Sequence, residues 1–183
     1  MTTLLRFEGV ALRRGGRLLF EDLSFELGAG DRLQITGPNG TGKSSLLRLA
    51  AGLLQQERGQ VDRVQFALAD DHLALDRELS VRRSLGFWVG NVDDTITALG
   101  LGPLAELPIR LLSSGQAKRA TLARVVASGA PLWLLDEPFN ALDSDGFNQF
   151  QKLMDAHCEA GGAVLAASHL RLTPNCTRLE LGE

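Results

Sequence analysis

The chain has 183 residues, of which 44% are hydrophobic and 22% charged, with a formal net charge of −3 at pH 7. This length predicts one domain able to bury a core, and the negative charge argues against nucleic-acid binding. No apolar run approaches the roughly 20 residues that a membrane span needs, and the N-terminus has no signal-peptide pattern. We therefore expect a cytoplasmic protein whose membrane attachment comes through a partner.

The first 30 residues predict a small antiparallel sheet. Residues 4–10 alternate loosely between apolar and polar side chains, and Leu23, Phe25 and Leu27 alternate with polar neighbours, as in half-buried strands. Gly15-Gly16 between these segments predicts a hairpin turn.

The stretch LQITGPNGTGKSSLLRLAAGLL, residues 33–54, carries the strongest functional signal. It places the G-x-x-x-x-G-K-[ST] pattern between an apolar run and a helical pattern, the context in which this motif binds phosphate. Glycines let backbone N–H groups surround phosphate oxygens, and the positive end of the helix adds attraction. This context favours a phosphate loop over an ordinary glycine-rich turn. The predicted nucleotide-binding residues are Gly37, Pro38, Asn39, Gly40, Thr41, Gly42, Lys43, Ser44 and Ser45.

The end of this loop also predicts the ligands. Lys43 can reach the β- and γ-phosphates of a nucleoside triphosphate, and the Ser44 hydroxyl can bind Mg²⁺. We therefore expect a nucleoside triphosphate and Mg²⁺ as the bound groups.

The middle of the chain changes character. The polar stretch 55–60 ends the helical pattern, and residues 61–68 predict one further strand. Ser80 is a predicted N-cap for a helix over residues 81–89, and Asp93-Asp94 begin a helix that Gly100 ends. Residues 72–111 therefore predict a mostly helical subdomain, with residues 1–71 and 112–183 forming the core of a single domain.

The last third predicts parallel α/β architecture. A helix over 116–128, an unbroken apolar strand over 132–135, a helix over 147–157 and a last buried strand over 163–167 follow in order. Alternating strands and helices favour a parallel sheet with right-handed crossovers, whose ligands lie beyond the carboxyl ends of the strands. Gly37, Asp136 and His169 fall at such ends.

Asp136-Glu137 follows the apolar strand directly. Asp136 can hold Mg²⁺, most simply through water, and Glu137 can orient and deprotonate an attacking water. The alternative is a strand that merely ends in acidic turn residues. The phosphate loop earlier in the chain favours the catalytic interpretation.

Five segments together resemble the ABC-type ATPases, in the family's order and over nearly the whole chain. Besides the phosphate loop and the Asp136-Glu137 segment, these are LSSGQ (112–116), resembling the signature motif, ALD (141–143), resembling the D-loop, and His169, resembling the switch histidine. In that family the signature motif faces the γ-phosphate held by the other subunit. The resemblance implies a homodimer around two ATP molecules, with Ser113, Gly115 and Gln116 acting in trans. A helix N-cap by Ser113 or Ser114, worth about 1 kcal/mol, is compatible with that role.

Two positions depart from this family. An aromatic residue, often Tyr, usually stacks on the adenine, whereas this chain has no Tyr and holds Arg13-Arg14 at that place. Arg14 is a candidate for stacking on the base, against a solvated arginine. The family also has a glutamine in the loop after the next core strand, and our alignment puts His72 there.

Within the superfamily, the chain is similar to the ATP-binding subunits of the haem exporter of cytochrome c biogenesis. The similarity rests on the sequence in and around the motifs: RLLFEDLSFEL (17–27), APLWLLDEPFNALD (130–143) and AVLAASH (163–169). It implies an integral membrane transporter subunit as partner and a place on the cytoplasmic face of the inner membrane. Export of another cargo and a soluble, non-transport ABC ATPase are the alternatives.

Side chains of two helical regions have alternative interpretations. Phe87, Trp88 and Arg82-Arg83 lie where family members contact their membrane subunit, although such aromatics are often subdomain core. We expect Lys118, Arg119 and Arg124 on the solvated face of the helix after the signature motif.

Overall fold

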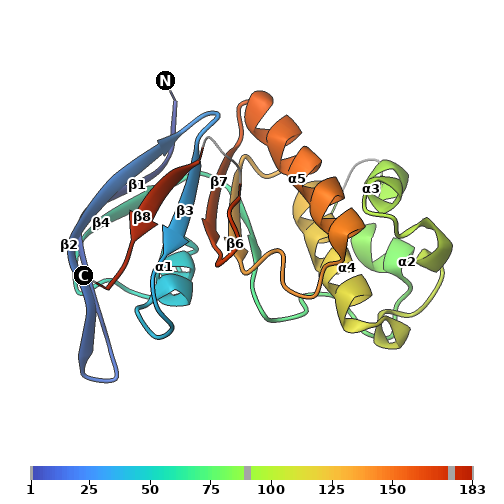
Figure 1. Cartoon of the computed structure of the whole chain (residues 1–183), viewed down its shortest axis with the longest axis horizontal. Helices are drawn as coiled ribbons and strands as arrows, with labels where there is room; N and C mark the ends of the chain where they lie inside the picture. Colours follow the sequence, from blue (N-terminus) through green and yellow to red (C-terminus); the bar gives the residue numbers. More distant parts are fainter. Residues whose placement is uncertain (1, 89–91, 173–175, 183) are drawn as a thin grey trace.

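The computed structural model describes residues 2–88, 92–172 and 176–182. The chain forms two sheets (Figure 1). The antiparallel sheet has the order β2-β1-β4, with β1 at Thr3–Arg14, β2 at Arg17–Gly28 and β4 at Arg58–Arg63. The parallel sheet has the order β5-β6-β7-β3-β8, with strands at Phe66–Ala69, Leu132–Asp136, Ala163–Ala167, Arg32–Thr36 and Thr177–Glu180. The predicted α/β class and the small antiparallel sheet are confirmed.

Helices cover both faces of the parallel sheet. Helix α1 (Lys43–Ala50) lies between the two sheets, whereas α4 (Ser114–Ala127) and α5 (Ser144–Glu159) pack on the opposite face (Figure 1). Helices α2 (Val81–Leu85) and α3 (Val92–Ala98) lie beyond α4, followed by the 3₁₀ turns Gly102–Leu104 and Ile109–Leu111. None of the helices in the described ranges is both long and apolar enough to cross a membrane.

The alternation of side chains along the central strands divides the core in two. Leu132 and Leu134 pack toward α1 and the antiparallel sheet, whereas Trp133 and Leu135 pack toward α4 and α5. All residues of β6 and β7 are buried, because helices cover both faces of the sheet. The continuous apolar runs therefore predicted the type of both strands and the bounds of β7 correctly, while β6 extends one residue further, to Asp136.

Several predicted elements differ in the structure. The single strand expected over residues 61–68 is wrong, because the chain passes there from one sheet to the other: β4 pairs with β1, and β5 pairs with β6. Strand β8 at the edge of the parallel sheet was not predicted. The helix expected over 81–89 ends at Leu85, with Gly86 as its C-cap, and Val89 lies outside the described residues.

Candidate nucleotide-binding site

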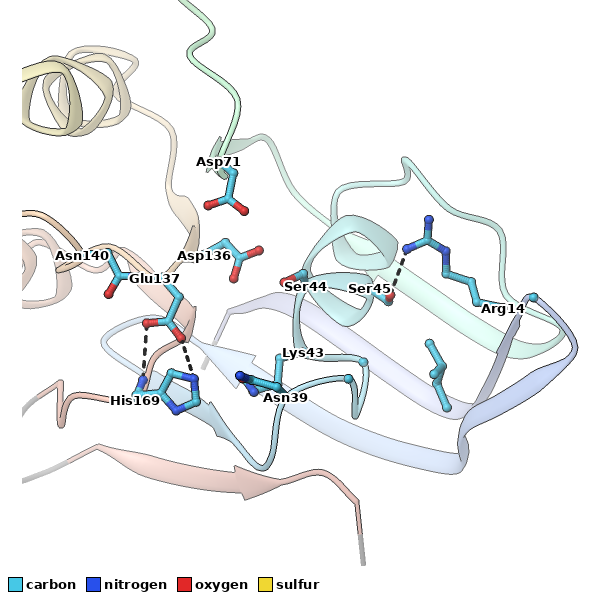
Figure 2. Close-up of a pocket in the computed structure, with 14 residues that line it drawn as sticks. Arg14, Asn39, Lys43, Ser44, Ser45, Asp71, Asp136, Glu137, Asn140 and His169 are labelled. Atoms are coloured by element: carbon cyan, nitrogen blue, oxygen red, sulfur yellow. Dashed lines mark hydrogen bonds and ion pairs between the residues drawn. The ribbon is translucent and has the colours of Figure 1, made fainter. Parts of the chain in front are cut away.

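A cleft of about 950 Å³ opens at the carboxyl ends of β3 and β6 (Figure 2). It collects residues from the antiparallel sheet, the phosphate loop, the segment after β5 and the ends of β6 and β7. The lining residues are Arg14, Gly15, Leu19, Asn39, Gly40, Gly42, Lys43, Ser44, Ser45, Asp71, Asp136, Glu137, Asn140 and His169. The predicted meeting of Asp136, Glu137 and His169 with the phosphate loop is thus present.

The phosphate loop needs its glycines for geometric reasons. Gly37, Gly40 and Gly42 have φ values of 132°, 82° and 107°, which side chains rarely tolerate. A Cβ on Gly37 would lie 2.2 Å from the carbonyl oxygen of Leu181, just after β8. A Cβ on Gly40 would meet nothing within 4 Å, so this position faces open space. The loop therefore combines tight packing on one side with an open backbone on the other.

Lys43 holds the loop in shape. Its side chain is nearly buried, and Nζ donates hydrogen bonds to the carbonyl oxygens of Gly37 at 2.8 Å and Pro38 at 3.0 Å. The Thr41 hydroxyl also donates to the Pro38 carbonyl, at 2.9 Å. Gly37, Pro38 and Thr41 thus support the loop, while the cleft is lined by the other predicted loop residues. The first turn of α1 has Gly42 as N-cap and no side-chain cap, which leaves it suited to an anion.

Ser44 at the start of α1 and Asp136 at the end of β6 both supply oxygen atoms to the cleft (Figure 2). Burial raises the pKa of the Asp136 carboxyl, and a hydrogen bond from Ser44 opposes this rise. A hydroxyl and a carboxylate suit Mg²⁺, which prefers oxygen ligands. Within the described ranges, no three His, Cys, Asp or Glu side chains are grouped to hold a metal. A magnesium ion here would therefore depend on phosphate oxygens of the nucleotide.

Glu137 and His169 contact each other although they follow different strands, β6 and β7. Glu137 has a φ of 43°, and its backbone N–H donates to the Ala167 carbonyl at 2.8 Å, which fixes this turn against β7. His169 Nε2 lies 3.4 Å from Glu137 Oε1, and the His169 backbone N–H donates to Glu137 Oε2 at 3.5 Å (Figure 2). The carboxylate that was predicted to handle water is therefore oriented by the predicted switch histidine.

The three signature residues lie elsewhere. Ser113, Gly115 and Gln116 line a separate pocket of about 340 Å³ with the D-loop residues Ala141 and Asp143. Ser113 caps α4: its hydroxyl accepts from the Gln116 N–H at 3.3 Å, and Gln116 Oε1 accepts from the Ser113 N–H at 2.9 Å. The predicted capping is confirmed. One chain does not bring these residues to its own phosphate loop.

In the loop after β5, the residue that lines the cleft differs from the one we expected. Asp71 lines the cleft, whereas His72, which we expected at this position, does not. The His72 ring is bound to Asp70 instead, with Nδ1 3.1 Å from Oδ2. The pair Asp70-Asp71 alone gave no indication of which carboxylate would face the cleft. Asn140 was also missed; it lies within the family-like stretch 130–143 but in no motif of its own.

The expectation of a solvated basic face on α4 was wrong. Arg124 is buried and donates to the Leu68 carbonyl, with its guanidinium 5.2 Å from the centre of the Trp88 ring. Lys118 Nζ donates to the Asp136 carbonyl at 3.2 Å, and Arg119 pairs with Asp143. Burial lowers the pKa values of Lys118 and Arg124. Long basic side chains can bury their stems along a helix, which periodicity does not reveal.

Arg14 lies at the rim of the cleft, on the hairpin between β1 and β2. Its Nη1 donates to the Ser45 hydroxyl at 3.3 Å, so the guanidinium is tied to the first turn of α1 (Figure 2). None of the described residues that line the cleft is Phe, Tyr or Trp. Any contact with a nucleobase at this rim would come from Arg14, Gly15 and Leu19.

The fold and this cleft define a P-loop ATPase, and comparisons with known proteins specify the family. Residues 20–140 match the ABC transporter family, and the chain belongs to it. It is an ABC-type ATP hydrolase. Two relatives are cytochrome c biogenesis ATP-binding export proteins CcmA. That of Sphingopyxis alaskensis is 48% identical over 100% of this chain and 98% of its own length. That of Novosphingobium aromaticivorans is 49% identical over 87% of this chain and 85% of its own length.

Solved structures agree on the fold. The ATP-binding subunit of an ABC transporter superposes with a TM-score of 0.87 at 20% identity, over 98% of this chain and 86% of that one. An ABC transporter ATP-binding protein from Pyrococcus furiosus gives a TM-score of 0.84, also at 20% identity, over 97% of this chain and 96% of that one.

Proposed function

We propose that two copies of this chain close around two Mg·ATP molecules and hydrolyse them to drive an integral membrane transporter subunit. The observation that supports this most directly is the cleft itself, which joins an uncapped helix N-terminus, Lys43, Ser44, Asp136 and Glu137. These are the groups needed to bind a triphosphate, hold its metal and activate water.

The residues would act mainly by position and charge. Lys43 is already placed beside the loop backbone, where its ammonium group can stabilise charge on the β- and γ-phosphates. Glu137 accepts a proton from the water that attacks the γ-phosphate, and His169 steadies both Glu137 and the γ-phosphate. Mg²⁺, held by Ser44 and Asp136, would neutralise charge between the β- and γ-phosphates.

The second copy is required because the signature residues are in a different pocket. Ser113, Gly115 and Gln116 would contact the γ-phosphate bound by the partner copy, with Asp143 communicating across the interface. Residues 72–111 would then move with the signature helix as a helical subdomain of the same domain. This makes the complete site a property of the dimer.

An apolar groove supports the proposal of a membrane partner. Its volume is about 620 Å³, and its lining includes Leu53, Phe87, Trp88 and Arg124. The side chains of Leu53 and Phe87 are 61% and 72% exposed, which is unusual for large apolar residues grouped together. The Arg124 contact holds Trp88 at the edge of this groove. We propose that a short helix of the transporter subunit binds in this groove. The names of the relatives support a haem export complex of cytochrome c biogenesis, with this chain on the cytoplasmic face of the inner membrane.

The catalytic proposal is tested with Glu137→Gln. Loss of a general base lowers rates by about 10²–10⁴-fold, so phosphate release should fall by that factor while ATP binding is retained. Because the nucleotide then stays intact, light scattering should detect a dimer with Mg·ATP and a monomer without it. A rate like that of the unchanged chain would remove Glu137 from the base role.

The membrane proposal needs a separate experiment. Affinity purification of the tagged chain from membranes should recover an integral membrane protein, and Phe87→Ala with Leu53→Ala should weaken its recovery without changing the ATPase rate of the isolated chain. A matched variant at exposed Leu170, outside the groove, serves as control. Recovery of a transporter for a different cargo, or retention on DNA with no membrane protein, would contradict the export assignment.

A further inference from the structure

Gln34 is a buried polar residue in the strand that leads into the phosphate loop. It is 2% exposed and lies between the apolar residues Leu33 and Ile35 on β3. Strand β3 lies between β7 and β8, where Gln34 is paired with Ala166 and Arg178 (Figure 1). Burial of an amide without hydrogen-bond partners is costly, so the partners of this side chain indicate its role.

The Gln34 side chain binds the backbone on both sides of His169. Its Nε2 donates to the carbonyl oxygens of Ser168 at 2.8 Å and Leu170 at 2.9 Å. Its Oε1 accepts from the Leu172 N–H at 3.4 Å. One amide group therefore holds the segment that follows β7 at three backbone positions.

The position of His169 depends on this backbone. The His169 side chain is 60% exposed, so little packing holds its ring. It meets the Glu137 carboxylate twice, through a ring nitrogen and through its own backbone N–H (Figure 2). Rotation of the peptide groups beside His169 would turn both groups away from Glu137. These are the peptide groups whose carbonyl oxygens Gln34 binds.

We propose that Gln34 is a positioning residue for His169: its buried amide fixes the peptide groups around the histidine so that the ring meets Glu137 and the γ-phosphate. This inference rests on the proposed role of His169 in ATP hydrolysis. Because β3 continues into the phosphate loop at Gly37, the same side chain also places the histidine relative to that loop. Gln34 does not line the cleft, so it would affect turnover rather than nucleotide binding.

The first test needs no nucleotide. The chain has three histidines, His72, His157 and His169, so their ring signals can be assigned in an NMR spectrum by single substitutions to alanine. Gln34→Met keeps the length of the side chain and removes its hydrogen bonds, so it should shift the His169 signal. The His157 signal should stay, because that ring is stacked on Trp133 with 3.9 Å between ring centres and reports an intact core.

Gln151→Met is the matched control. Gln151 Nε2, on α5, donates to the Leu172 carbonyl, so this variant removes an amide hydrogen bond from the same segment but three residues beyond His169. It should leave the His169 signal in place. Gln34→Asn, whose amide is one carbon shorter and should not reach both carbonyls, is used if Gln34→Met does not fold. An unmoved His169 signal in a folded Gln34 variant overturns the inference.

Turnover gives the second test. Phosphate release at saturating Mg·ATP should fall by about tenfold in Gln34→Met while KM stays within about twofold, since a misplacement of about 1 Å can cost about 100-fold in rate. In a chain that already carries His169→Ala, Gln34→Met should have no further effect, whereas an independent structural effect would multiply with the first.

The two tests separate the possible failures. A multiplied loss in the double variant overturns the positioning role of Gln34. A His169→Ala chain that hydrolyses ATP at the full rate would instead remove the proposed role of His169. An unchanged chain that does not hydrolyse Mg·ATP would contradict the proposed function, and the NMR comparison would still decide whether Gln34 positions the histidine.

Discussion

Helices α1 and α4 both begin at a place predicted to face phosphate, yet their first turns are built differently. Helix α1 starts after Gly42, which is in a left-handed conformation and offers no side chain to the N–H groups that follow. Helix α4 starts after Ser113, where a reciprocal pair of hydrogen bonds with Gln116 caps the turn. The first end is open before any ligand arrives, and the second is already satisfied by its own chain.

This difference between the two helix ends indicates that nucleotide binding to the single chain precedes the proposed closure of the dimer. The open end of α1, together with Lys43, can take up a nucleotide in a single chain. The capped end of α4 is stable without a ligand, and in the proposed dimer it would contact a phosphate that the second chain brings. A capping bond is worth about 1 kcal/mol, which is small compared with the charge-assisted contacts of a triphosphate. The cap can therefore stabilise the free chain and still allow the proposed dimer to close.

Lys43→Met removes the charge at the open end and should have the largest effect. Hydrogen bonds to charged groups contribute about 1.5–3 kcal/mol, and the ammonium is expected to contact two phosphates. ATP affinity, measured by isothermal titration, should fall by about 100-fold or more. Lys152→Met, at an exposed position on α5, is the control and should bind as the unchanged chain does.

Ser113→Glu at the capped end should separate binding from closure. Its carboxylate would face the partner's γ-phosphate and repel it. ATP-dependent dimer formation and turnover should therefore fall by about tenfold, which corresponds to about 1.4 kcal/mol. Binding of ATP to the single chain should stay unchanged. Mixing this variant with Lys43→Met should restore phosphate release, because one composite site per mixed dimer is intact. Failure of ATP to bind to Ser113→Glu would show that the two ends are not independent.

Ser113→Ala tests the cap without adding a charge. We expect the free energy of unfolding to fall by about 1 kcal/mol, seen as a lower melting temperature by about 2–4 °C. Gln116→Ala, which removes the returning hydrogen bond, should act in the same direction. A melting temperature that does not move would mean that the capping pair contributes nothing to the free chain.

We expect the smallest effect on nucleotide affinity from a substitution of Arg14, at the rim of the cleft beside α1. Arg14 is tied to Ser45, and the described lining residues beside it, Gly15 and Leu19, offer no ring to a nucleobase. An arginine stacked on a base contributes about 0.5–1 kcal/mol, so Arg14→Ala should weaken ATP and GTP alike by about two- to fivefold. Unchanged affinities would show that Arg14 is solvated instead.

Sequence reasoning succeeded where one segment contains the whole signal. The phosphate loop carries its glycines, lysine and serine within eight positions, and β6 and β7 are continuous apolar runs because both of their faces are covered. It failed at β8, whose residues Thr177–Glu180 lie at the sheet edge and are mostly exposed. It also merged β4 with β5, since a change of sheet leaves no periodic mark.

The amino-acid pattern alone determined the parallel α/β class, the phosphate loop, the acidic strand end and the family resemblance, because each depends on short local segments and on their order along the chain. Only the tertiary structure decided that Asp71 rather than His72 faces the cleft, that His169 meets Glu137, and that Lys118 and Arg124 are drawn inward. These outcomes depend on which strand ends and helix faces meet in space. Local spacing does not encode that choice, because the packing of distant segments sets the direction of each side chain.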